Sequence, residues 1–89
     1  MIDVRLEGDK MITPEKAQSH IKKRMDFEDN YGATPDALWD ALNDIEEPTA
    51  ITLYDTQAML NNLGQYGYDL LDTFQDAAKV NGDLLFEED

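Results

Sequence analysis

The order in which strand-like and helix-like segments alternate constrains the fold more than any other feature of the sequence. Residues 2–6 (IDVRL) alternate apolar and polar side chains, residues 50–54 (AITLY) are rich in β-branched and aromatic types, and residues 83–86 (DLLF) form a third short apolar segment. Helical patterns fill the chain between them, which gives the order β-α-α-β-α-α-β. Because helical crossovers join parallel strands, the sequence predicts an α/β fold: a small three-stranded parallel sheet packed against about four helices.

The first two helices carry the same start signal. Residues 13–15 (TPE) and 34–36 (TPD) each place a capping hydroxyl, a proline and an acid in succession. We therefore expect one helix over about 14–24 and a second over about 35–45.

Glycine and asparagine mark the expected bounds of the later helices. A third helix, capped by Asp55 or Thr56, should run to about residue 63. Gly67 should precede a fourth helix over about 68–80, and residues 81–82 (NG) should end it in a left-handed C-cap.

Length and composition indicate one domain, residues 1–89, with an ordinary core. The chain has 42% hydrophobic residues, no cysteine, and neither a signal-peptide pattern nor an apolar run long enough to span a membrane. We expect a cytoplasmic protein without disulfides or zinc-thiolate sites.

Charge is distributed unevenly along the chain. The net charge is −13, and between Met25 and Ala78 there are twelve acids and no lysine or arginine. A negative field of this kind repels nucleic acid and attracts basic proteins. We therefore expect a basic protein partner, no nucleic acid, no membrane contact and a monomeric state.

The second predicted helix has two chemically distinct faces. At about 100° per residue, its apolar side chains gather on one side and its polar ones on the other. The apolar face holds Leu38, Ala41, Leu42 and Ile45. The polar face holds Asp36, Asp40 and Asn43, with Trp39 on its flank.

The sequence gives little support for a catalytic site or a metal-binding site. Asp26, Glu28 and Asn30 have calcium-loop spacing, but the sixth position is tyrosine rather than glycine and the twelfth is alanine rather than an acid. Ser19 and His20 are adjacent on a helix and cannot face each other, so they form no dyad, and a lone histidine there is typical of a surface or half-buried position. We expect no enzyme activity, metal or cofactor.

The two helical aspartates suit recognition of arginine. Asp36 and Asp40 lie about 6 Å apart along the helix axis, and no lysine or arginine shares their helix. A guanidinium group binds carboxylate and phosphate alike, so such acids can pair with arginines that otherwise hold phosphates.

The segment from Tyr31 to Leu42, with its YG followed by DALWDAL, closely resembles the signature of the barstar family, intracellular inhibitors of the ribonuclease barnase. The resemblance extends to length, element order and the form of the last helix. It implies a binding face on the second helix, the loop before it and part of the fourth helix.

The resemblance also assigns residues. Asp40 matches the aspartate that takes the place of a substrate phosphate, and Asp36, Tyr31, Thr34 and Asp76 match other contact positions. The full set of expected partner-binding residues is Asn30, Tyr31, Gly32, Thr34, Asp36, Trp39, Asp40, Asn43 and Asp76. The expected partner is a microbial ribonuclease of the barnase type or a related toxin.

Some positions depart from the family pattern. Asn30 stands where barstar has its first loop tyrosine, Ala33 where it has a glutamate, and Ile45 where it has a second tryptophan. The alternative is therefore an acidic interaction module of the same fold that binds a basic partner other than a nuclease. Structural roles also stay open, with Trp39 and Tyr31 as core cover, and a left-handed turn is the expectation for Gly32.

Overall fold

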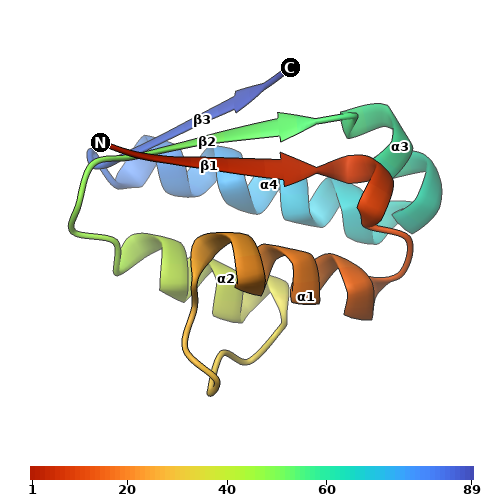
Figure 1. Ribbon diagram of the computed structural model, residues 1–89, viewed down its shortest axis with the longest axis horizontal. Coiled ribbons are helices and arrows are strands. Elements are labelled where there is room, and N and C mark those ends of the chain that lie inside the picture. The colour runs from red at the N-terminus through yellow and green to blue at the C-terminus, as the bar shows by residue number, and fades with distance from the viewer.

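Three strands form one parallel sheet in the computed structural model, which describes residues 1–89 (Figure 1). They are β1 (Ile2–Glu7), β2 (Thr49–Tyr54) and β3 (Leu84–Glu88), in the spatial order β1-β2-β3. The predicted fold class and strand positions are confirmed. The strand β3 extends beyond the predicted segment 83–86 through Glu87 and Glu88, because these residues pair with Thr52 and Leu53 of β2.

Four α-helices connect the strands: α1 (Pro14–Met25), α2 (Pro35–Asn43), α3 (Thr56–Leu63) and α4 (Gln65–Val80), with a short 3-10 turn η1 (Gly8–Lys10) after β1. The two predicted start signals are confirmed. The Thr13 hydroxyl accepts from the Lys16 amide at 3.2 Å, and the Thr34 hydroxyl accepts from the Ala37 amide at 3.0 Å. No helix combines the length and apolar character needed to cross a membrane.

Three local expectations about helix ends were wrong. Gly67 lies inside α4, where a Cβ would come within 3.3 Å of the Leu60 Cα, so this glycine permits close packing of α3 on α4 rather than a break. Asn81 is extended (φ −99, ψ 109) and not left-handed. Asp55 stands at the start of α3 with φ 54, but its side chain makes no capping hydrogen bond.

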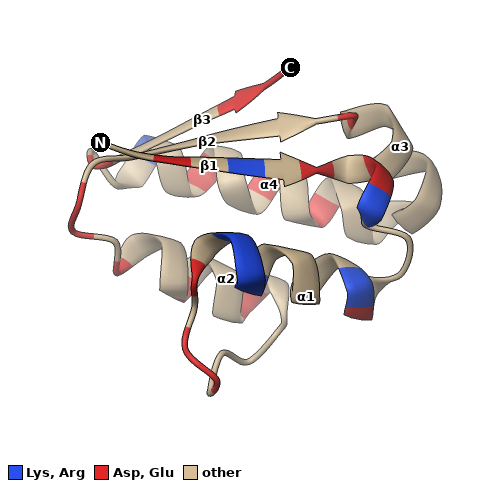
Figure 2. Ribbon diagram, viewed as in Figure 1, with Lys and Arg blue, Asp and Glu red and all other residues tan.

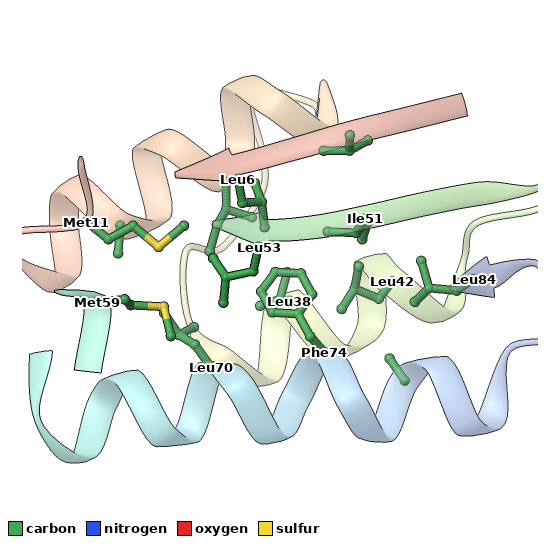
Figure 3. Close-up of a cluster of buried hydrophobic side chains, with 14 residues drawn as sticks. Leu6, Met11, Leu38, Leu42, Ile51, Leu53, Met59, Leu70, Phe74 and Leu84 are labelled. Carbon is green, nitrogen blue, oxygen red and sulfur yellow. The ribbon is translucent and has the colours of Figure 1, made fainter. Parts of the chain in front are cut away.

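The topology leaves one face of the sheet open. Helical crossovers between parallel strands are right-handed as a rule. The crossovers from β1 to β2 and from β2 to β3 advance in the same direction across the sheet, so both place their helices on the same face of it. Along β1, Val4 and Leu6 are buried, whereas Asp3 and Arg5 are exposed on the other face. The hydrophobic core therefore fills the space between the sheet and helices α2 and α4 (Figure 3).

A polar network joins β1 to α1 around Glu7. Its carboxylate contacts Lys10 at 3.0 Å, Arg24 at 2.8 Å and Arg5 at 3.9 Å, and the hydrogen bond from Lys10 is the main reason that the pKa of Glu7 is lowered. The Glu7 amide donates to His20 Nε2 at 2.9 Å. Burial of the ring, helped by the charge of Arg24, lowers the pKa of His20 below 6.5. The fold therefore holds His20 as a neutral acceptor.

Asn81 fastens the C-terminal end of α2 to the rest of the molecule. Its side-chain Nδ2 donates to the carbonyl of Leu42 at 2.9 Å and to that of Ile45 at 3.0 Å, and its Oδ1 accepts from the Asp83 amide at 2.9 Å. Carbonyls at a helix end lack partners within their own helix, so this side chain satisfies groups that α2 cannot satisfy itself. Asn81, which the sequence marked as the end of the fourth helix, thus caps α2 through tertiary hydrogen bonds.

The state of His20 predicts a pH dependence of stability. Because its folded-state pKa is lowered, the unfolded chain binds the proton more tightly, and the His20 contribution to the free energy of unfolding is present above 6.5 and lost as pH falls toward the folded-state value. Urea unfolding at about pH 7.5 and about pH 5.5 should show a larger loss in the parent than in His20→Gln, whose amide oxygen can accept the same bond without titrating. Equal losses would contradict this assignment.

The Asn81 contacts predict a stability effect as well. Asn81→Ala removes three hydrogen bonds and should lower the free energy of unfolding by about 1–3 kcal/mol. Urea unfolding measures the change. Asn62→Ala is the matched control, because Asn62 is exposed on α3 and should change stability little. A similar result for both variants would rule out the tertiary cap.

Candidate functional site

The two faces of α2 lie as the sequence predicts. Leu38 and Leu42 are fully buried, and Ala41 is half-buried. Asp36 and Asp40 are both exposed on the other side of the helix. Burial of the leucines fixes the rotation of α2 about its axis, and this rotation turns both carboxylates to solvent.

Helix α4 packs beside α2 and adds a third acid. Its inner face consists of Leu70, Phe74 and Ala77, which are buried, while Asp76 is exposed. We call Asp36, Asp40 and Asp76 together the acidic face. The structure places all three on the surface of two neighbouring helices.

No cation of the protein neutralises the acidic face. Three of the four ion pairs converge on Glu7, and the fourth joins Lys22 to Asp29. Figure 2 shows lysine and arginine on β1, on the turn after it, on α1 and at the end of α4, and none on α2 itself. The carboxylates of the acidic face are therefore free to accept hydrogen bonds from another molecule.

Trp39 and Asn43 lie beside the acidic face and are both half-buried. Trp39 packs against the hydrophobic core, as the structural reading of this residue expected, while part of it remains accessible. The Asn43 side chain turns back along the helix and donates to the Trp39 carbonyl at 3.0 Å. One of the two side-chain N–H donors of Asn43 is therefore used within α2.

The loop before α2 departs from one expectation. Gly32 does not adopt the left-handed conformation; its neighbour Ala33 does, with φ 54. A Cβ at Gly32 would lie 3.1 Å from the Ala37 Cβ, so glycine allows the loop to approach α2 closely there. A left-handed conformation at a non-glycine residue costs about 1–2 kcal/mol, so Ala33 is a point of backbone strain in this loop.

The remaining loop residues divide between surface and anchor. Asn30 and Thr34 are exposed, and Thr34 also caps α2. Tyr31 is half-buried, and its ring centroid lies 4.8 Å from that of Phe27. Burial raises the pKa of Tyr31 far above its ordinary value of 10.0, which keeps the phenol protonated.

Two residues that hold Tyr31 were missed in the sequence. The Tyr31 hydroxyl donates to Gln18 Oε1 at 2.6 Å, and Gln18 Nε2 donates to the Tyr66 hydroxyl at 2.9 Å. The sequence held a signal for Gln18 alone, because Gln18 lies beside Ala17 and three residues before Ile21, on the inner side of α1. In the structure Gln18 is 3% exposed. A buried glutamine needs polar partners, but the pattern does not say which ones.

Comparison with known proteins agrees with this geometry. The family model described as "Barstar (barnase inhibitor)" matches residues 1–86. A Bacillus subtilis (strain 168) protein named "Putative ribonuclease inhibitor YrdF" is 31% identical over 78 residues, covering 86% of this chain and 86% of the relative. The chain therefore belongs to the barstar family, whose members are protein inhibitors and not enzymes.

Proposed function

We propose that this protein inhibits a ribonuclease by seating its acidic face in the cationic active site, with the Asp40 carboxylate in the place of a substrate phosphate. The observation that carries the proposal is that Asp36, Asp40 and Asp76 are exposed and have no cation of their own within ion-pair distance. Arginines that line a phosphate site form charge-assisted hydrogen bonds with carboxylates in the same fork geometry.

Rigidity of α2 supports this mechanism. The helix is capped by Thr34 at one end and held by Asn81 at the other, and Leu38 and Leu42 anchor its inner face. A surface that is already ordered loses less conformational entropy when it binds. Asp36 and Asp40 therefore approach the enzyme at a fixed separation.

The surroundings of the acidic face form the rest of the proposed interface. Asn30, Tyr31, Gly32 and Thr34 supply the loop side, and Trp39 and Asn43 supply the flank of α2. We propose a microbial ribonuclease of the barnase type or a related toxin as the partner, and an immunity or antitoxin role for a monomeric protein in the cytoplasm. The negative field of a chain with net charge −13 would steer such a basic partner toward the interface.

One observation favours a second candidate. The loop offers Asn30 and Ala33 in place of an aromatic and an acidic family residue, and both are exposed where a partner would touch them. An acidic module that binds a basic protein other than a nuclease fits this altered rim. Inhibition assays against a panel of microbial ribonucleases separate the two, since only the first function predicts competitive inhibition.

Asp40→Asn should weaken inhibition with little change in fold. The substitution keeps the side-chain shape but removes the charge, and hydrogen bonds to charged groups contribute about 1.5–3 kcal/mol, so the inhibition constant should rise roughly ten- to a hundredfold. A competitive assay with an inhibited ribonuclease measures it, and the association rate of the parent should fall as salt is raised.

Asp3→Asn is the matched control for that experiment. It removes one carboxylate from the exposed face of β1, on the side of the sheet away from the helices. Its effect on inhibition should be small, because it changes only the long-range field. Undiminished inhibition by Asp40→Asn, or an equal loss in both variants, would refute the phosphate-mimicry mechanism.

A further inference from the structure

The loop before α2 is attached to the body of the protein by very few contacts. Every residue from Glu28 to Thr34 is exposed except Tyr31. Lys22 reaches Asp29 at 3.6 Å, but the Asp29 side chain is fully exposed, and ion pairs of this kind contribute little. Tyr31 is therefore the only side chain of these residues that enters the protein.

A hollow of about 490 Å³ lies behind this loop, between it and the first turns of α1 and α4. Gln18, Lys22, Tyr31, Ala33 and Tyr66 are among the residues that line it. Packing does not fill the space, so the loop does not rest on a continuous apolar surface there. Its position depends on the packing of the Tyr31 ring against Phe27 and the hydrophobic core, and on the polar contacts that cross from the loop to the helices.

One hydrogen-bonded chain makes that crossing. Tyr31 donates from the loop to Gln18 on α1, and Gln18 donates in turn to Tyr66 on α4, at 2.6 and 2.9 Å. Gln18 is 3% exposed, so breaking either bond would leave a buried amide without a partner. We call Tyr31, Gln18 and Tyr66 the tyrosine relay.

We propose that Gln18 and Tyr66 are positioning residues, which hold Tyr31 and with it the loop before α2 in the conformation that meets the partner. This inference rests on the proposed function for its binding consequence, while the ordering of the loop concerns the free protein alone. Because the Tyr31 hydroxyl is engaged inside the relay, Tyr31 offers a partner its ring and not a hydrogen-bond donor.

The relay affects affinity through the population of the ordered loop. If only a fraction of the free molecules holds the loop in place, the apparent dissociation constant rises by the inverse of that fraction. The loop also carries the strained Ala33, so it gains by relaxing once the anchor is released. Gln18 and Tyr66, which do not contact the partner, would then determine the fraction of free molecules whose loop is already in the binding conformation.

Hydrogen exchange on the free protein tests the ordering. The reporter is the Tyr31 amide, which donates to the Glu28 carbonyl at 3.0 Å within the loop. Tyr66→Phe removes one hydroxyl, and Gln18→Met replaces the amide with a side chain of similar length. Each should speed exchange of the Tyr31 amide about two- to tenfold relative to core amides such as that of Leu53. Tyr68→Phe is the control, because Tyr68 is 50% exposed and makes no side-chain hydrogen bond.

The same variants are then compared in the ribonuclease assay. Gln18→Met and Tyr66→Phe should raise the inhibition constant by about the factor found in exchange, and Tyr68→Phe should not. Unchanged exchange of the Tyr31 amide in both relay variants, or faster exchange with unaltered inhibition, would overturn the positioning role. If the parent inhibits no ribonuclease, the proposed function fails, and the exchange result alone decides whether the relay orders the loop.

Discussion

The burial of Leu38 and Leu42 is the interaction on which the rest of the structure depends. Both side chains are fully buried, and each contributes about 1.5–3 kcal/mol by leaving water. Side chains on a helix have fixed directions relative to one another, so seating these two leucines against the core turns Asp36 and Asp40 outward. The acidic face is therefore a geometric consequence of core packing.

The distribution of charge has a structural cause and a cost. Glu7 gathers Arg5, Lys10 and Arg24 at the junction of β1 and α1, so three of the seven bases are paired with Glu7 and not with the acids of α2. Apart from Asp29, which Lys22 contacts, the other acids have no lysine or arginine partner and repel one another, which destabilises a compact state. The same lack of partners leaves the acidic face available. Placing the cations away from the acidic face thus lowers the stability of the fold somewhat and leaves a surface that carries only negative charge.

Local rules predicted the order of elements, the capped helix starts and the inner faces, because each depends on residues a few positions apart. They failed where tertiary contacts determine the backbone. Gly67 allows two helices to pack closely, Asn81 caps a different helix, and Gly32 leaves room for the Ala37 side chain. All three are residue types that are typical of turns. The exposure of Asp36 and Asp40 followed from helical periodicity, whereas Asp76 was assigned only through the family resemblance. Gln18 and Tyr66 lie far apart in the sequence, so no local pattern could join them through Tyr31.

The two halves of the candidate interface are held in place by different interactions, so a change in one need not disturb the other. The orientation of α2 is tied to the hydrophobic core, so moving Asp40 would require repacking the interior. The loop before α2 is held mainly through one residue, Tyr31, and its exposed residues can change at little cost to the fold. Because the core sets the orientation of α2, substitutions in the loop can change the surface beside Asp36 and Asp40 without moving these carboxylates.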